Sequence, residues 1–203
     1  MNIPIATVKE LREATGAGFL DCRNALQETG GDFDKAVEYL RKKGLATAVK
    51  RASRATPEGV IGSYVHAGSR VAALVEVNCE TDFVARTDDF LNLAHDLAMQ
   101  VVATRPRYLI PEDIPAEVIN AEKEAHRAQM ADLNKPEHVI DKIIENKLQH
   151  YYQEVCLMQQ PFIKNEGLTV QDVVNQVAAR LGENIVVRRF VRFELGEEIG
   201  ATV

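Results

Sequence analysis

The spacing of apolar positions changes near residue 58 of this 203-residue chain. Before that point, apolar side chains recur every three or four residues, as they do along one face of an amphipathic helix. From Gly59 onwards they alternate with polar ones in two runs, residues 60–66 and 70–78, joined by the turn sequence Ala67-Gly68-Ser69. Such a pair of runs is typical of a β-hairpin. The pattern therefore predicts helices first and an antiparallel sheet afterwards.

Residues 1–44 are expected to form a three-helix module. The sequence Thr7–Glu10 fits a capping box at the start of the first helix, and Gly16 fits its left-handed end. A second helix is expected over about 19–29. The third carries its apolar residues at helical spacing and should end at Gly44. A module of this size is small for a domain that folds alone.

Residues 59–203 are expected to form one α+β core domain. After the hairpin, a helix is predicted over 88–104, and two longer helices lie between about 115 and 158, with a break at 134–136. The second long helix carries a narrow apolar stripe of Ile140, Ile144, Leu148, Tyr151, Val155 and Met158. A stripe this narrow suits a helical hairpin, and it fits equally well as packing inside the hairpin or as a seam between two chains.

The C-terminal part adds one helix and one strand. Thr169 is placed to cap a helix that Gly182 ends. The strand should follow over 185–195, and its inner face should carry Ile185, Val187, Val191, Phe193 and Leu195. Arg189 interrupts this alternation, so a bulge or a sheet edge is expected there.

Charge is unevenly distributed in a chain that is acidic overall. The formal net charge is −6, yet residues 1–56 hold 10 basic and 7 acidic side chains. A basic stretch leads into and covers the predicted linker, residues 45–58; its members are Arg41, Lys42, Lys43, Lys50, Arg51 and Arg54. Such a stretch could contact RNA or an acidic protein surface. Because no aromatic residues lie between the charges for base stacking, a solvated helix end is the simpler interpretation.

The sequence gives little support to membrane, export or enzymatic roles. No apolar run approaches the ~20 residues of a membrane span, and residues 1–7 resemble no export signal. The three cysteines, Cys22, Cys79 and Cys156, form no disulfide framework, and neither they nor the histidines show zinc-ligand spacing. There is no phosphate loop and no nucleophile elbow. We therefore expect a cytoplasmic protein that is not an enzyme and holds no cofactor or metal.

One stretch, residues 78–86, is unusual because it places a carboxylate beside a large aromatic ring where a strand gives way to a helix. These two residues are Asp82 and Phe83. On physical grounds alone, Phe83 would pin the following helix to the core and Asp82 would cap that helix.

Five motifs together resemble the translation elongation factor Ts family. They are Thr15-Gly16-Ala17-Gly18-Phe19-Leu20-Asp21-Cys22, Gly30-Gly31-Asp32, Glu76-Val77-Asn78-Cys79-Glu80-Thr81-Asp82-Phe83-Val84-Ala85, Gln160-Pro161-Phe162 and Arg192-Phe193-Glu194-Leu195-Gly196-Glu197. The resemblance runs through nearly the whole chain and is to short members, such as those of cyanobacteria or plastids. It implies a ubiquitin-associated-like N-terminal module and a guanine-nucleotide exchange factor for the GTPase elongation factor Tu. Such a protein would act in the cytoplasm or in a plastid stroma.

The same resemblance implies roles for particular residues. A loop of Thr81, Asp82, Phe83 and Val84 would disturb the magnesium site of the GTPase and so release GDP. The module would contact the nucleotide domain of the GTPase through Gly16, Ala17, Gly18, Phe19 and Leu20. A second contact, through Tyr64 and His66, would reach another domain of the GTPase. One of Phe19 and Leu20 should serve the module's core while the other stays free to dock.

The chain shows one core unit where longer family members carry two, so we expect a homodimer that gives a 2:2 complex with the GTPase. No membrane and no direct nucleic-acid contact is expected in this interpretation. The alternative from a different class of function is a ubiquitin-associated-like scaffold that binds ribosomes or RNA through the basic linker.

Overall fold

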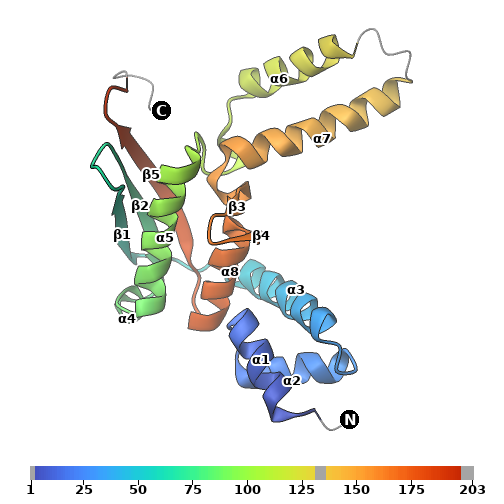
Figure 1. Cartoon of the computed structure of the whole chain (residues 1–203), viewed down its shortest axis with the longest axis vertical. Coiled ribbons are helices and arrows are strands. Elements are labelled where there is room, and N and C mark those ends of the chain that lie inside the picture. The colour runs from blue at the N-terminus through green and yellow to red at the C-terminus, as the bar shows by residue number, and fades with distance from the viewer. Residues whose placement is uncertain (1–2, 131–135, 198–203) are drawn as a thin grey trace.

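The structure, a computed structural model, describes residues 3–130 and 136–197. It divides into a helical N-terminal module, an α+β core and a helical hairpin that protrudes from the core (Figure 1). The predicted α+β class is therefore confirmed.

The N-terminal module consists of α1 (Ile5–Thr15), α2 (Phe19–Glu28) and α3 (Phe33–Arg51). It has an apolar core of its own, formed by Val8, Leu11, Cys22, Ala25, Leu26, Ala36 and Leu40. The three helices fit a ubiquitin-associated-like module, as predicted.

The predicted start of the first helix is wrong. α1 begins at Ile5, directly after Pro4, whose φ of −61° and extended ψ make it the N-cap residue. Thr7 therefore lies inside the helix and caps nothing. Proline already has the φ value that leads into a helix, so no side-chain cap is needed to start this one.

The third helix also runs further than predicted. α3 continues through Gly44 to Arg51, so the first half of the predicted linker is helical. A glycine inside a helix costs only about 1 kcal/mol relative to alanine. Packing offsets this, because α3 lies against α8 (Val170–Leu181) and the Arg51 guanidinium donates to the carbonyl oxygen of Ala178 at 3.1 Å.

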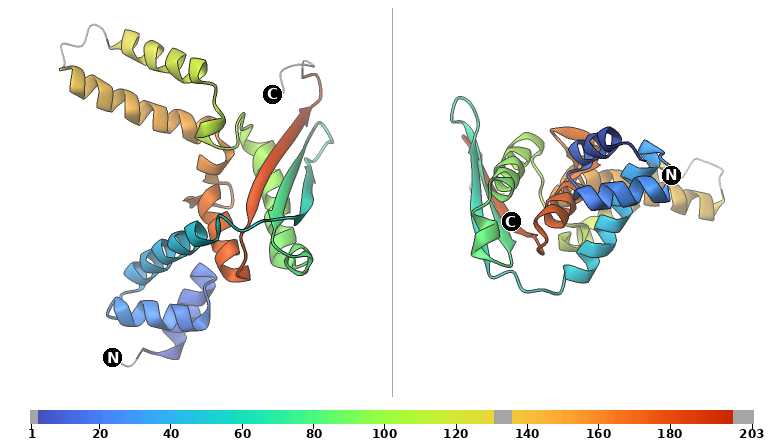
Figure 2. Two further views of the ribbon diagram at one scale, coloured as in Figure 1. Left: turned by 180° about the vertical axis from the view of Figure 1, so that it is seen from behind. Right: turned by 90° about the horizontal axis from the view of Figure 1, so that it is seen from below.

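The core is built on a three-stranded antiparallel sheet in the order β1-β2-β5, with β1 at Glu58–Val65, β2 at Val71–Cys79 and β5 at Val186–Glu194. The helix α5 (Asp88–Thr104) packs on one face of the sheet, and α8 packs against α5 on the same side (Figure 2). No helix of the described residues covers the other face, which we call the outer face.

The predicted bulge in the last strand is confirmed, and it reverses the side-chain faces beyond it. The pairing with β2 shifts by one residue after Val187, so Arg188 is the extra residue. Beyond it, Phe190 packs against the core, whereas Phe193 is 64% exposed on the outer face. The predicted inward positions of Val191, Phe193 and Leu195 are therefore wrong, because one inserted residue turns every later side chain to the opposite face.

The hairpin consists of α6 (Ala116–Gln129) and α7 (Glu137–Val155). Ile144 and Leu148 of the predicted stripe are buried with Met130 inside the hairpin, so the stripe packs within the chain and does not form a free seam. The predicted break at 134–136 lies outside the described residues except for Pro136, which precedes α7.

Short elements join these larger ones. They are α4 (Asp82–Ala85), the 3-10 turns η1 (Pro111–Asp113) and η2 (Leu157–Gln159), and the paired strands β3 (Pro161–Phe162) and β4 (Asn165–Thr169). The side chain of Thr169 caps α8 and Gly182 ends that helix at φ +81°, both as predicted.

Candidate functional site

The Thr81 loop, which we define as Thr81–Val84, presents an aromatic side chain to solvent. Phe83 is 81% exposed, more than any other large apolar side chain in residues 3–130 and 136–197. The Thr81 hydroxyl, not Asp82, caps α4 by accepting from the N–H of Val84 at 3.4 Å. The physical expectation that Phe83 pins a helix to the core and that Asp82 caps it is therefore wrong.

The residues that follow Phe83 anchor the loop to the core. Ala85 is buried and Val84 packs partly against the core cluster. The Thr87 hydroxyl donates to the carbonyl oxygen of Val84 at 2.8 Å and caps α5 by accepting from the N–H of Phe90. These contacts supply the packing that Phe83 does not, so the ring projects from an ordered segment.

Asp82 is paired within its own turn. Its carboxylate forms an ion pair with Arg86, four residues later, at 2.9 Å. Arg86 is largely exposed, so this pair is accessible to a partner and is worth little to stability.

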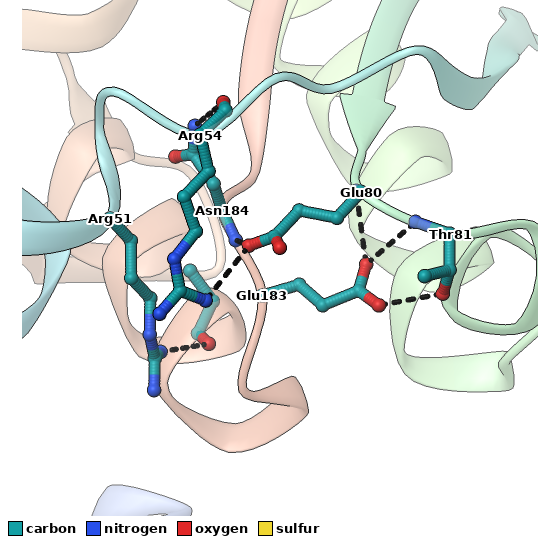
Figure 3. Close-up of polar contacts among 7 residues, drawn as sticks. Arg51, Arg54, Glu80, Thr81, Glu183 and Asn184 are labelled. Atoms are coloured by element: carbon teal, nitrogen blue, oxygen red, sulfur yellow. Dashed lines mark hydrogen bonds and ion pairs between the residues drawn. The ribbon is translucent and has the colours of Figure 1, made fainter.

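A polar network lies directly behind the Thr81 loop (Figure 3). The carboxylate of Glu183 accepts from the N–H of Glu80 at 3.0 Å, from the N–H of Thr81 at 3.1 Å and from the Thr81 hydroxyl at 2.6 Å. In the opposite direction, the Glu80 carboxylate accepts from the N–H of Asn184 at 2.6 Å and from Arg54 at 3.3 Å. These contacts lower the pKa of Glu80, with the N–H of Asn184 as the largest cause that lowers it.

Sequence reasoning missed this network entirely. Glu183 and Thr81 lie 102 residues apart, and Asn184 and Arg54 lie 130 apart. Four of the six bonds, counting the one from the Asn184 side-chain amide to the Arg54 carbonyl oxygen, involve backbone groups, which leave no signature in a sequence.

The glycine turn of the module lies against α8. Gly16 has φ +66° and ends α1, as predicted. The guanidinium of Arg180 occupies the space beside it, so close that a Cβ at this position would lie 2.2 Å from Arg180 Nη2. Arg180 also pairs with Asp89 in the first turn of α5, at 3.2 Å. Because α5 begins just after the Thr81 loop, the turn and the loop lie at the same end of the molecule.

Both large apolar side chains after the turn are exposed. Phe19 is 38% and Leu20 68% exposed, and neither belongs to the core of the module. That core takes Cys22, Ala25 and Leu26 from the same helix. The expectation that one of the two residues fills the core is therefore wrong, and both are accessible from outside.

Tyr64 and His66 lie elsewhere. The Tyr64 hydroxyl is 3.3 Å from His66 Nδ1, and its ring meets that of His95 edge-on, with 5.5 Å between centroids. In the β1–β2 ladder Tyr64 pairs with Ala73, six residues before Cys79 at the end that carries the Thr81 loop. The two sites therefore lie about 20 Å apart along the sheet. In Figure 1 the connection between β1 and β2 and the helix α4 lie at opposite ends of the sheet.

The cysteines are unsuited to nucleophilic chemistry. Burial raises the pKa of Cys79 and of Cys156 to about 11, and both side chains are inaccessible to solvent. In the part of the chain that the structure describes, no three histidine, cysteine or carboxylate side chains gather to hold a metal ion. Across the same ranges no helix has the length and apolarity needed to span a membrane.

The fold and these surfaces define a class of protein: an α+β protein with a small helical module, which displays apolar side chains on ordered loops. A family model described as Elongation factor TS matches residues 24–197. The chain is 58% identical over 197 residues to elongation factor Ts of Moorella thermoacetica, covering 97% of each chain. It is 55% identical over 198 residues to elongation factor Ts of Thermotoga neapolitana, covering 98% of this chain and 100% of that one. The chain belongs to the elongation factor Ts family and so to the nucleotide exchange factors of translation elongation.

Proposed function

We propose that this protein binds elongation factor Tu in its GDP form and promotes GDP release, with Phe83 inserted into an apolar crevice of the GTPase. The observation that carries the proposal is the 81% exposure of Phe83 on a loop whose neighbours are anchored. Moving a phenylalanine side chain from water into an apolar site contributes about 1.5–3 kcal/mol. That gain is available to a partner because the folded chain itself does not use it.

Asp82 would act beside the ring. In a GTPase, Mg²⁺ bridges phosphate oxygens of the nucleotide and neutralises their charge. A carboxylate brought next to that ion's ligands would disturb their arrangement and weaken the hold on GDP. Thermodynamic linkage then requires that bound nucleotide lowers the affinity of the GTPase for the exchange factor by the same ratio. Asp82 is available for this role after breaking only its exposed pair with Arg86.

Three surfaces would share the contact with the GTPase. The Thr81 loop and the turn of Gly16, Ala17 and Gly18, with Phe19 and Leu20 beside it, lie at one end of the molecule and suit the nucleotide domain. Tyr64 and His66 lie about 20 Å away along the sheet and suit a different domain.

The partner of the outer face would be a second copy of the chain. Apolar side chains are exposed on that face at Ile61, Val65, Leu74 and Phe193. The strand register places Val65 and Phe193 on either side of Ala72, one row from Leu74. A contiguous apolar patch on a sheet is typical of an interaction surface. We propose that a homodimer forms there and that a 2:2 complex with the GTPase results, one protomer offering its Thr81 loop and the other its Tyr64 end.

The scaffold alternative has no support in the structure. Most members of the basic stretch are engaged within the chain: Lys42 with Glu38 and Lys43 with Asp21, both at 2.9 Å, Arg54 with Glu80 at 3.3 Å, and Arg51 with the Ala178 carbonyl. The contacts of Arg51 and Arg54 attach the module to the core, as does the pair of Arg41 with Asp172 at 3.9 Å, whereas the two lysine pairs lie within the module. Four of these side chains already face a carboxylate, which reduces the positive charge available to RNA.

The test of the exchange function follows the release of fluorescent GDP from elongation factor Tu at catalytic concentrations of this protein. The wild-type chain should accelerate release, and Phe83→Ala should reduce that acceleration by about tenfold or more, as expected for loss of 1.5–3 kcal/mol of contact. The melting temperature of Phe83→Ala should stay within a few degrees of wild type, since Phe83 is 81% exposed and contributes little to the core. A buried phenylalanine would instead cost about 3–5 kcal/mol on truncation, so a collapse in melting temperature would refute the wedge.

A further inference from the structure

We infer that Glu183 is a positioning residue for nucleotide exchange, because its carboxylate holds the connection between β2 and α4 in the shape that presents Phe83. The inference rests on the proposed function and names a residue that acts on it from behind the loop. Glu183 itself lies between α8 and β5, outside the Thr81 loop.

The geometry is a carboxylate that gathers three donors from two successive residues. One oxygen accepts both the Glu80 and the Thr81 N–H, and the other accepts the Thr81 hydroxyl (Figure 3). Hydrogen bonds to an ionised acceptor are about twice as strong as neutral ones. All three bonds fix the same point of the chain, where β2 ends and the loop begins.

The Thr81 hydroxyl transmits this hold to α4. A hydroxyl has one donor and two acceptor positions, so donation to Glu183 leaves its lone pairs to accept from the N–H of Val84. Glu183 thus orients the group that caps the short helix carrying Phe83. With only four residues, α4 has too few internal hydrogen bonds to hold its own shape.

Glu183 is in turn held in place by its neighbours. Gly182, at φ +81°, turns the chain out of α8 and brings Glu183 toward β2. The next residue, Asn184, donates its N–H back to Glu80 and its side-chain amide to the carbonyl oxygen of Arg54. The carboxylates of Glu80 and Glu183 each accept from the other's segment, and with Asn184 they connect the end of β2, the end of α8 and the stretch after α3.

Loss of Glu183 should loosen the loop without unfolding the core. Thr81 is exposed, so water can replace the carboxylate at its N–H and hydroxyl. The loop would then sample several shapes, of which only a fraction present Phe83 correctly. A binding-competent fraction of about one tenth weakens apparent affinity about tenfold and leaves the bound state unchanged.

The experiment compares Glu183→Ala and Glu183→Gln with the matched control Asp96→Asn. Asp96 also makes a short charged contact, 2.6 Å to Lys164, but lies along α5 away from the loop. In GDP release from elongation factor Tu, Glu183→Ala should raise KM about tenfold with kcat nearly unchanged, while Asp96→Asn should leave both unchanged. Glu183→Gln keeps one acceptor oxygen and should fall between wild type and Glu183→Ala.

Two readouts separate positioning from general stability. Backbone hydrogen exchange at Glu80 and Thr81 should accelerate in Glu183→Ala of the free protein, while the amides of the β1–β2 ladder keep their protection. In addition, Glu183→Ala should cause a much smaller further loss of exchange when Phe83 is already alanine, because only Asp82 then remains on the loop to be positioned.

Each contrary result is decisive. Unchanged amide exchange, unchanged KM or a fully additive loss with Phe83→Ala would each overturn the role of Glu183 and leave the exchange function intact. If the wild-type chain did not accelerate GDP release from elongation factor Tu, the proposed function and this role would be overturned together.

Discussion

Cys79 and Phe83 lie four residues apart, yet their surroundings give them opposite accessibility. Cys79 is inaccessible to solvent, and burial and then the nearby charge of Glu183 raise its pKa to about 11. Burial also raises the pKa of Cys22 and takes that of Cys156 to about 11. A thiol reacts as its thiolate, and with a pKa raised to about 11 only roughly one in a thousand is ionised at pH 8.

Alkylation therefore provides a test of the packing at these positions. With iodoacetamide at pH 8, the native protein should remain unmodified at all three cysteines over a period in which the unfolded chain takes up three labels, counted by intact mass. Raising the pH toward the pKa of about 11 should increase the thiolate fraction, although access still requires opening of the core. Rapid labelling of native Cys79 at pH 8 would contradict the structure around the Thr81 loop.

At the scale of single residues, the sequence allowed the Thr81 loop to be found but not its support. Asp82 beside Phe83 was visible as an unusual pair, whereas the exposure of Phe83 was not. An aromatic residue before a helix fits a core anchor equally well, and only the packing of Val84 and Ala85 shows that the anchor is already supplied. Glu183 was beyond prediction because its partners are largely backbone N–H groups more than 100 residues away.

At the scale of elements, the contact between the module and α8 can be tested through two glycines of nearly equal conformation. Gly16 and Gly30 have φ of +66° and +67°, but a Cβ at Gly30 meets nothing within 4 Å, whereas at Gly16 it meets the Arg180 guanidinium. Gly30→Ala should cost about 1–2 kcal/mol from left-handed backbone strain alone. Gly16→Ala should cost the same plus up to about 1 kcal/mol, because Arg180 must swing away and its exposed pair with Asp89 is weakened.

The excess should vanish when Arg180 is first replaced by alanine. Denaturant unfolding of the four single and double variants measures both differences. If Gly16→Ala still cost more than Gly30→Ala in the Arg180→Ala background, the excess would come from some other contact of the turn.

The elements that could be predicted are those whose ends carry local chemistry. The helix predicted at residues 88–104 agrees with α5 (Asp88–Thr104), because its apolar positions repeat with helical period; in the structure the Thr87 side chain caps it. The end of α3 differs from the prediction because a glycine often ends a helix, whereas here tertiary packing on α8 carries the helix past Gly44 to Arg51. In β5 the prediction assigns the wrong faces beyond the bulge. Arg189 indicates that a bulge is present, but only the pairing with β2 shows that Arg188 is the inserted residue.

At the scale of the whole molecule, the uncovered outer face makes the oligomeric state the decisive measurement. Four of its side chains, Ile61, Val65, Leu74 and Phe193, are more than 40% exposed, and no described helix shields them. Pairing of two such faces about a two-fold axis buries both patches at once. Light scattering should therefore give about twice the chain mass of 22.6 kDa.

Phe193→Asp should shift this equilibrium to the monomer, because a charge would have to be buried in an apolar interface. The folded monomer should persist, since Phe193 is 64% exposed and contributes little to its own core. Leu91→Asp is the matched control: Leu91 is 44% exposed on α5, away from the outer face, and its replacement should leave the dimer mass unchanged. If one protomer supplies the Thr81 loop and the other the Tyr64 end, monomeric Phe193→Asp should also accelerate GDP release from elongation factor Tu less than wild type does. A monomer that exchanges nucleotide at the full rate would show that a single core unit is sufficient.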